Sequence, residues 1–536
     1  MLKNNFLIVC ILLTLVTLSC ARRGALSGGD KDTIAPVLKA SFPKNFSTNF
    51  KGKEIELVFD EYIKLKNLDK QLIISPILKN KPEISPQLAT KKLKIKLNDT
   101  LLPNTTYSFN FGQSIEDNNE GNPLSQFKFV FSTGTFIDSL ALNVRVKDAL
   151  EKNPEPFISV MLYEINDTYN DSTVYKETPK YISNTLDKSN EVRLENLKQG
   201  KYLLIALKDN GNDKYNPSTD KVAFHKQYIT VPNDSVFELK LFKEKNSFNT
   251  KKPIQTSKNR LLLGYEGDPK NTSIKVKNGA QTVPVIVTKF PNKDSLQIWY
   301  KPVKADSLEI EVANNSYRKN YYTKISDSEN IKQDTLSFSP EFKGTLPLRE
   351  RFSITSNTPL LKFDKSKISI FNKDSMAVAF DTEYVEREQK LYVNFNKEPQ
   401  EKYKITMLPG AFTDFYESQN DTLKYKVITK NYNDYGNLKV TLENVKKYPL
   451  LLQLTDKDGK VKASQYSEKN SILEFLLLEP NTYSLRVIYD DNLNQEWDTG
   501  SYPEKKQPEE VIYFPKDIDI RANWDIEQPF DLGIMN

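Results

Sequence analysis

Residues 105–134 read TTYSFNFGQSIEDNNEGNPLSQFKFVFSTG and hold two strand patterns around a turn. Aromatic residues recur at every second position from Tyr107 to Phe111 and again from Phe127 to Phe131. A period of two places alternate side chains on one face of a sheet, so the rings of both segments are expected in one core. Between them, DNNEGN supplies Asx residues and the permissive backbone of Gly121, as turns require. The stretch predicts two strands of a β-sandwich.

The same alternation continues along most of the 536 residues, and no sustained 3.6-residue pattern interrupts it. Further examples are Ile55-Leu57-Phe59, Leu140-Leu142-Val144-Val146, Val283-Val285-Val287 and Leu308-Ile310-Val312. Asn, Asp, Gly and Pro separate these runs, which predicts an all-β chain of serial β-sandwiches. The length corresponds to about three to five domains.

The first unit resembles a known family. Residues 34–63, IAPVLKASFPKNFSTNFKGKEIELVFDEYI, show an Ala-Pro start, a P-x-N turn and a strand ending in Phe-Asp-Glu. Residues 105–134 add a Tyr strand, a D-x-x-G-N turn and an F-x-T-G strand. In this order the elements resemble bacterial Ig-like domains of the S-layer type. The resemblance covers residues 34–135 and implies an Ig-like sandwich.

The chain also repeats itself. Residues 191–216 align with residues 472–498 at a constant offset through the first Asp, which is Asp209 in one copy and Asp490 in the other. Both copies resemble the L-x-x-G-x-Y edge of prealbumin-like, or carboxypeptidase-regulatory-like, β-sandwiches. Residues 403–429 parallel the closing segment of the first unit, which predicts a second Ig-like domain before the second copy.

The N-terminus predicts the compartment. The apolar run from Phe6 to Leu18 is shorter than the ~20 residues of a membrane span, so it is typical of a signal peptide, with a short membrane anchor as the alternative. The Cys20 that follows resembles the lipobox cysteine of bacterial lipoproteins, which implies acylation there. Two or three acyl chains provide stable attachment. The polar, Gly-containing stretch after it is typical of a lipoprotein tether.

These observations give an expected layout. It comprises a signal peptide (1–19), a lipidated tether (20–33), an Ig-like domain (34–135), a prealbumin-like sandwich (136–250), a β-rich middle domain (251–340), a second Ig-like domain (341–432) and a second prealbumin-like sandwich (433–536). The whole arrangement resembles Ig-like-domain lipoproteins of Bacteroidota. That resemblance implies outer-membrane anchoring. Arg22 and Arg23 stand where surface-exposed lipoproteins of that group commonly carry acidic residues, so the surface-exposed and periplasm-facing placements both stay open.

Composition excludes several chemistries. The cysteines are Cys10, in the cleaved segment, and Cys20, so the mature chain is expected to lack disulfides and a thiol nucleophile. His225 is the only histidine, which excludes zinc sites built on several His or Cys, and its alternating neighbours indicate an ordinary strand residue. Lys and Arg total 76 against 70 Asp and Glu, and the charges are interleaved, which disfavours nucleic-acid binding. An enzyme with this composition would therefore have to use carboxylates as its catalytic groups, as glycoside hydrolases do.

One loop suggests a metal. The stretch YDDNLNQEWDTG (489–500) places oxygen ligands at alternate positions, as a Ca²⁺ loop does, but it lacks the Gly and the bidentate Glu of an EF-hand. Two interpretations stand. The loop is an Asx-rich connection between strands, or it binds Ca²⁺ weakly as a structural ion, with no other cofactor expected. The candidate ligands are Asp490, Asn492, Asn494 and Asp498.

A short triplet also recurs: Asp, then Ser or Thr, then a third residue that is apolar in all cases but one, where it is Thr173. The triplets exceed the roughly two expected from composition. They resemble the O-glycosylation acceptor of extracytoplasmic Bacteroidota proteins, and they also fit a turn that begins a strand. The candidate acceptors are Thr33, Thr100, Ser139, Ser172, Ser235, Ser295, Ser307, Thr335, Ser375 and Thr422.

Three classes of function are compatible with the sequence. The first is a non-enzymatic interaction or scaffold lipoprotein, with an envelope protein as partner, such as an outer-membrane β-barrel complex that assembles or exports proteins. The second is a carbohydrate-binding surface lipoprotein using Trp299, Trp497 and Trp524, which do not cluster in sequence. The third is a carboxylate-dependent hydrolase, which would require two inward carboxylates about 5–10 Å apart in a cleft. We favour the first.

Overall fold

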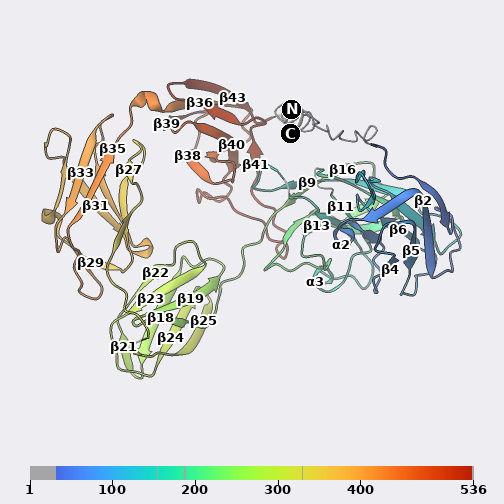
Figure 1. Cartoon of the computed structure of the whole chain (residues 1–536), viewed down its shortest axis with the longest axis horizontal. Helices are drawn as coiled ribbons and strands as arrows, with labels where there is room; N and C mark the ends of the chain where they lie inside the picture. Colours follow the sequence, from blue (N-terminus) through green and yellow to red (C-terminus); the bar gives the residue numbers. More distant parts are fainter. Residues whose placement is uncertain (1–31, 154, 186–188, 329, 534–536) are drawn as a thin grey trace, which may run out of the picture.

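The structure is a computed structural model that describes residues 32–153, 155–185, 189–328 and 330–533. It is built almost wholly of β-strands, which confirms the predicted serial β-sandwiches (Figure 1). Five hydrophobic cores follow one another along the chain, and we number the sandwiches 1 to 5. The predicted signal peptide, Cys20 and most of the tether lie outside the described residues. Within the described ranges, no helix is long and apolar enough to cross a membrane.

Sandwich 1 contains the stretch that predicted the fold. One sheet has the order β1 (Leu38–Phe42), β2 (Glu54–Leu65), β5 (Thr90–Lys96) and β4 (Glu83–Ser85), with β7 (Ile115–Asp117) on β2. The other sheet has β3 (Ile73–Ser75), β6 (Thr106–Asn110) and β8 (Lys128–Ser132), and α2 (Leu68–Gln71) lies between β2 and β3. Phe129 and Phe131 are fully buried, as predicted, while Phe127 packs at the margin of the core. Asp117 accepts backbone N–H groups from the turn that ends at Asn122.

Sandwich 2 pairs a large and a small sheet. The large sheet has β11 (Tyr181–Asn184), β10 (Ser159–Glu164), β13 (Gly200–Lys208) and β14 (Lys221–Phe224), with β15 (Ile229–Val231) on β13. The small sheet has β12 (Glu191–Leu197), β9 (Leu140–Asp148) and β16 (Val236–Leu241), and α3 (Thr173–Lys176) covers part of the large sheet. The large sheet is buried on both faces, because a second hydrophobic cluster forms outside the sandwich.

Sandwich 3 consists of two larger sheets. The first has β17 (Asn249–Thr250), β19 (Arg260–Glu266), β23 (Ser295–Tyr300) and β22 (Val285–Lys289), with β18 (Ile254–Ser257) on β19. The second has β21 (Gln281–Val283), β20 (Thr272–Asn278), β24 (Ser307–Asn314) and β25 (Tyr317–Lys324).

Sandwich 4 repeats the topology of sandwich 1. Its sheets are β26 (Phe338–Pro340), β28 (Phe352–Ser356), β32 (Lys390–Phe395) and β31 (Phe380–Val385), and β27 (Gly344–Thr345), β35 (Leu423–Ile428), β33 (Lys402–Met407) and β30 (Ile368–Phe371). A two-stranded sheet joins β29 (Leu360–Phe363) to β34 (Phe412–Asp414), and η1 (Lys365–Lys367), η2 (Glu386–Glu388) and η3 (Tyr432–Asp434) are short 3₁₀ turns. The pair β28 and β29 takes the place of the single long β2.

Sandwich 5 repeats the topology of sandwich 2. Its small sheet has β39 (Ile472–Leu478), β36 (Gly436–Glu443) and β43 (Asp525–Asp531), and its large sheet has β38 (Val461–Ser467), β37 (Leu450–Thr455), β40 (Asn481–Tyr489) and β41 (Val511–Tyr513), with β42 (Ile518–Ile520) on β40. In both copies the first strand pairs in parallel with the last, β9 with β16 and β36 with β43. The internal repeat in the sequence therefore corresponds to a repeated topology.

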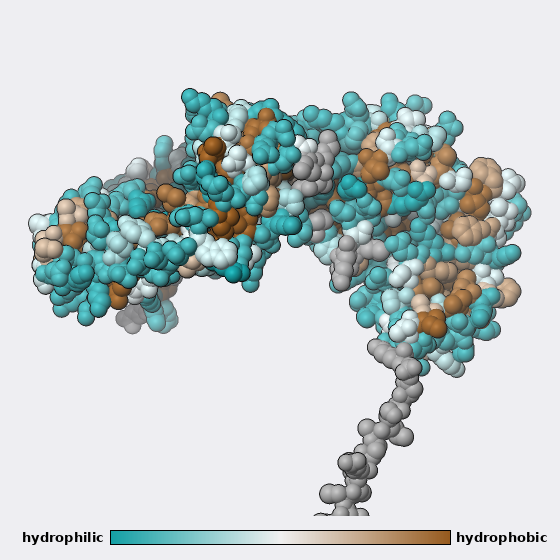
Figure 2. Space-filling view, turned by 90° about the horizontal axis from the view of Figure 1, so that it is seen from above, coloured by the Kyte–Doolittle hydropathy of each residue, from teal (hydrophilic) through white to brown (hydrophobic). Residues whose placement is uncertain are grey.

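The sandwiches do not form a straight rod. Sandwich 5 lies beside sandwich 2, although sandwiches 3 and 4 separate them in the chain (Figure 1). Sandwiches 2, 3, 4 and 5 thus form a closed circuit, and sandwich 1 packs on sandwich 2 outside it. The face seen in Figure 2 is mostly hydrophilic with separate hydrophobic patches.

Candidate functional site

The main contact that closes the circuit is made by residues 490–510, the connection between β40 and β41, which we call the clasp. It begins with the predicted Ca²⁺ loop and ends on sandwich 2. The corresponding connection of sandwich 2, residues 209–220 between β13 and β14, is much shorter. The clasp therefore contains chain that has no counterpart in the first copy of the repeat.

The base of the clasp is held by buried carboxylates. Asp490 accepts the backbone N–H groups of Asn494 (3.1 Å) and Gln495 (2.9 Å). Glu509 accepts the N–H groups of Asp491 (2.7 Å) and Asp498 (2.9 Å). Burial, with a smaller contribution from the charges of Asp498 and Asp490, raises the pKa of Glu509. These contacts are Asx-type turn chemistry, in which an acceptor side chain replaces the missing strand partners.

Asp498 links the base to sandwich 2. Its carboxylate accepts hydrogen bonds from the ammonium of Lys245 (2.5 Å) and from the side-chain amides of Asn492 (2.5 Å) and Asn494 (2.6 Å). Burial alone would raise the pKa of Asp498, but these bonds, led by that from Lys245, lower it. The four predicted Ca²⁺ ligands do lie together, with the Lys245 cation already at Asp498. No group of three or more His, Cys, Asp and Glu in the described ranges could hold a metal ion. The Ca²⁺ site stays a prediction.

The tip of the clasp is an aromatic plug. Tyr502 is fully buried, with its ring centroid 5.3 Å from that of Phe224 and 6.0 Å from those of Tyr175 and Tyr215. Gly500 permits this approach, because a Cβ there would lie 2.6 Å from the ring of Phe242. Burying such a ring stabilises the contact by about 1.5–3 kcal/mol. Burial also raises the pKa of the Tyr502 hydroxyl, which keeps the plug neutral.

Polar contacts around the plug reach the linker between sandwiches 2 and 3. The Thr499 hydroxyl donates to the carbonyl oxygen of Lys243 (2.7 Å), and the Tyr502 N–H donates to the carboxylate of Glu244 (2.7 Å). With Lys245 bound to Asp498, three consecutive linker residues are engaged. Glu496 adds an ion pair to Lys270 of sandwich 3 (2.9 Å). The clasp therefore fixes the joint between sandwiches 2 and 3 as well as docking sandwich 5.

A second contact supports the closure outside the clasp. Arg486 and the Tyr513 hydroxyl both donate to the carbonyl oxygen of Leu150 in sandwich 2, at 3.1 and 2.8 Å. An ion pair joins Lys152 to Asp517 (2.7 Å). Arg486 is almost fully buried, and its guanidinium also donates to the side-chain oxygen of Gln453 within sandwich 5 (3.0 and 2.9 Å).

The joint between sandwiches 3 and 4 is also buried and hydrogen-bonded. The Trp299 indole donates to the Thr288 hydroxyl (2.8 Å), which in turn donates to the side-chain oxygen of Gln389 in sandwich 4 (3.0 Å). The Tyr416 hydroxyl donates to the carbonyl oxygen of Asn259 (2.7 Å). Bending at this joint would break these hydrogen bonds and expose the Trp299 ring to water, so the joint resists bending.

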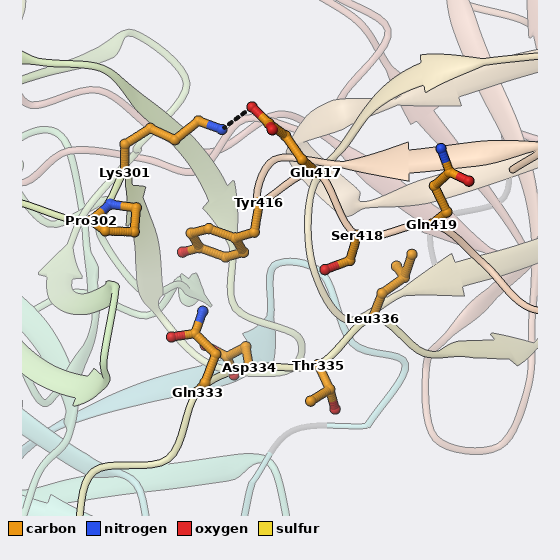
Figure 3. A pocket seen from close by; sticks show the side chains of 10 residues that line it. All are labelled: Lys301, Pro302, Gln333, Asp334, Thr335, Leu336, Tyr416, Glu417, Ser418 and Gln419. Carbon is orange, nitrogen blue, oxygen red and sulfur yellow. Dashed lines mark ion pairs between the residues drawn. The ribbon is translucent and has the colours of Figure 1, made fainter. Parts of the chain in front are cut away.

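A pocket of about 650 Å³ lies at this joint and contains two carboxylates (Figure 3). Glu417 is mostly exposed, and its side chain is directed toward Lys301, with which it forms an ion pair (3.7 Å). Asp334 pairs with Arg260 (3.1 Å). A glycosidase acid needs a carboxyl group kept protonated by apolar surroundings, whereas both of these have cationic partners. The pocket gives the hydrolase hypothesis no support.

The structure also places the other predicted residues. Trp299 is fully buried and Trp497 donates to the Glu509 carbonyl oxygen (3.2 Å), so they do not join Trp524 in a common aromatic platform. His225 follows β14 and packs edge-on against Phe237. Of the candidate acceptors, Ser172 and Ser295 are half-buried. The exposed ones are Thr33, Thr100, Ser139, Ser235, Ser307, Thr335, Ser375 and Thr422. Ser139, Ser235, Ser307 and Thr422 directly precede or begin strands, which suits both interpretations of the triplets, whereas the other four lie three or more residues before the next strand.

Sequence reasoning missed the clasp. Tyr502 lies in the polar stretch SYPEKKQP, where no periodicity predicts burial, and its partners are some 280 to 330 residues away. The available signal was the extra length of the connection in the second copy of the repeat.

Comparisons with known proteins identify a family for the first sandwich. Residues 32–133 match the family described as bacterial Ig-like domain, which confirms the resemblance of the first unit. No curated protein matches the chain. Among solved structures, the surface layer protein SbsC (domains 1–6) is 11% identical, with 91% of this chain and 67% of that chain covered and a TM-score of 0.16. The Bacillus anthracis TIE protein is 13% identical, with 98% and 78% covered and a TM-score of 0.15. The major pilin subunit BcpA of Bacillus cereus is 10% identical, with 73% and 99% covered and a TM-score of 0.13.

Proposed function

We propose that the chain is a non-enzymatic lipoprotein, anchored in the outer membrane through Cys20, that acts as an interaction scaffold. Its partner would be an envelope protein, such as a subunit of an outer-membrane β-barrel complex for protein assembly or export. The observation that supports a scaffold best is the clasp. A buried plug and a ring of polar contacts hold four sandwiches in one arrangement, and a fixed arrangement is what a scaffold has to present to a partner.

The alternatives receive less support. A carbohydrate platform needs exposed aromatic rings that lie together, whereas Trp299 and Trp497 are engaged inside the protein. The hydrolase hypothesis needs an unpaired carboxyl pair, and the carboxylates of the pocket between sandwiches 3 and 4 are ion-paired.

The proposal is tested in the native host with a tagged chain and a Cys20→Ser variant. We expect the parent to stay with membranes after a high-salt wash and to co-purify reproducibly with an envelope protein after gentle solubilisation. We expect Cys20→Ser to enter the soluble fraction. A variant that remains membrane-bound would contradict anchoring at Cys20, and a parent without any reproducible partner by mass spectrometry would contradict the scaffold.

A further inference from the structure

An edge strand of sandwich 5 carries exposed aliphatic side chains. Ile472 is 52% exposed and Leu476 is 57% exposed, and Glu474 lies between them on the same face of β39. In its sheet β39 is the last strand and has β36 as its strand partner. On its outer side the Gln465 side-chain amide of β38 donates to the Glu474 carbonyl oxygen (3.1 Å), a contact that an added strand would replace. We call Ile472, Glu474 and Leu476 the β39 edge. Edge strands with an apolar face are templates for pairing with another chain, which proteins normally block with charge.

The repeat supplies an internal reference for this edge. β12 of sandwich 2 is the counterpart of β39, and both contain a bulge where a residue takes positive φ, Asn196 (60°) and Leu477 (54°). At the constant offset of the two copies, Glu191 and Glu195 of β12 correspond to Ile472 and Leu476. The same position in the fold is therefore charged in one copy and aliphatic in the other.

The two glutamates of β12 already form ion pairs within the chain. Glu191 pairs with Arg145 (2.7 Å), and Glu195 pairs with Lys128 of sandwich 1 (2.5 Å). The β12 face therefore receives a cation from the neighbouring sandwich. Its counterpart in sandwich 5 receives none: among the described residues, no ion pair includes Glu474.

The cation across the strand pair from Glu474 is shared with another carboxylate. Lys439 is its cross-strand neighbour on β36, but the Lys439 ammonium binds Glu527 (3.0 Å). Asp525 of the same sheet receives the side-chain amide of Asn437 rather than a cation. The face thus presents two aliphatic side chains around a carboxylate that has no ion pair and only the weaker attraction of Lys439. Its complement is a cation flanked by apolar side chains.

We propose that the β39 edge binds an extended segment of a partner protein by strand addition, with a lysine or arginine opposite Glu474 and aliphatic residues opposite Ile472 and Leu476. Strand addition supplies main-chain hydrogen bonds, and the alternate side chains supply specificity. A second copy fits less well, because antiparallel pairing centred on this edge would set Glu474 against Glu474. The inference rests on the proposed scaffold function and names its docking surface.

The probe is a seven-residue peptide with lysine at its centre, valine two positions away on each side and threonine elsewhere. Binding to the full mature chain is measured by fluorescence anisotropy. We expect saturable binding by the parent, at least tenfold weaker binding by Glu474→Lys, and recovery of that loss with a peptide whose central lysine is replaced by glutamate. Ile472→Thr with Leu476→Thr removes the two aliphatic side chains without adding charge and keeps residues that favour strands, so it should fold normally and lose binding at least tenfold. Glu266→Lys, an exposed charge change on sandwich 3, is the matched control.

Two results would overturn the proposal that the β39 edge binds a partner strand, and a third would change the occupant. A parent that does not bind the probe, or binding that neither β39 variant reduces, would overturn the proposal. Self-association of the parent in sedimentation experiments that disappears in the double variant would replace it with a second copy as occupant. Failure here leaves membrane anchoring and co-purification unaffected, so it is distinguishable from failure of the scaffold proposal.

Discussion

Sandwiches 2 and 5 share a topology, yet the connections after their matching strands take different parts in the contact between the domains. In sandwich 2, Asp209 accepts the N–H groups of Asn212 (2.9 Å) and Asp213 (2.7 Å), and the short connection adds Tyr215 to the rings around Tyr502 before it enters β14. In sandwich 5, Asp490 makes the same kind of turn, and the clasp then continues onto sandwich 2. The comparison shows that the repeat preserves the core and the turn, while added loop length provides the contact between domains.

The largest effect is expected from the plug. Tyr502→Ala removes a buried ring and should destabilise the clasp by about 3–5 kcal/mol, since its socket cannot collapse. Hydrogen exchange read by mass spectrometry should show faster exchange in residues 243–245 and 498–507, with the core of sandwich 5 unchanged. Tyr322→Ala, at an exposed tyrosine on sandwich 3, is the control. Unchanged protection in Tyr502→Ala would show that the plug does not hold the clasp.

The ion pair at the base should matter less. Asp498→Ala leaves three donors without their acceptor, and because Lys245 is mostly exposed we expect a loss of about 1–2 kcal/mol of clasp stability. The folded pKa of Asp498 lies below its usual value of 3.8, so its contribution is present above pH 3.8 and is lost as pH falls through the folded value. Exchange measured at decreasing pH, corrected for intrinsic rates, should show the clasp opening in acid in the parent. An equal acid response in Asp498→Ala would assign it to another group.

Calcium separates the two interpretations of the turn. Because Lys245 and two asparagine amides already hold Asp498, we expect the melting temperature to be the same in millimolar Ca²⁺ and in chelator. A weak site of ~10⁻⁴–10⁻³ M would instead stabilise by about 1 kcal/mol. A shift of that size in the parent that Asp490→Ala abolishes would establish a structural ion.

The smallest effect on the fold is expected from glycans. Sandwich 2 carries the triplets of Ser139, Ser172 and Ser235, whereas residues 433–536 contain no such triplet. If the triplets are acceptors, chain from the native host should be heavier than chain from a host lacking this glycosylation, with the added mass on peptides of sandwich 2 and none on sandwich 5. Equal masses in both hosts would leave the turn interpretation alone.

The features that could be predicted from the sequence are those that depend on residues close together in the chain or on the internal repeat. The alternation predicted that Phe129 and Phe131 lie in a core, because a period of two can be recognised within a single strand. The repeat predicted the shared topology of sandwiches 2 and 5, because two segments of the same chain can be compared directly. The sequence also brought Asp490 and Asp498 into one loop. Neither the burial of Tyr502 nor that of Trp299 was predictable, because each depends on a surface from another sandwich. Residues that form contacts between domains do not follow a regular spacing of apolar residues, so the sequence does not reveal them.

The most direct test of the closed circuit is a distance between sandwiches 2 and 5. With Cys20 replaced by Ser, spin labels on cysteines at Glu238 and Lys469, both exposed, report that distance by double electron–electron resonance. The account predicts one narrow distance distribution in the parent, and a broad, longer one in Gly500→Val, whose added side chain would clash with Phe242. A broad distribution in the parent, or an identical narrow one in both chains, would contradict closure by the clasp.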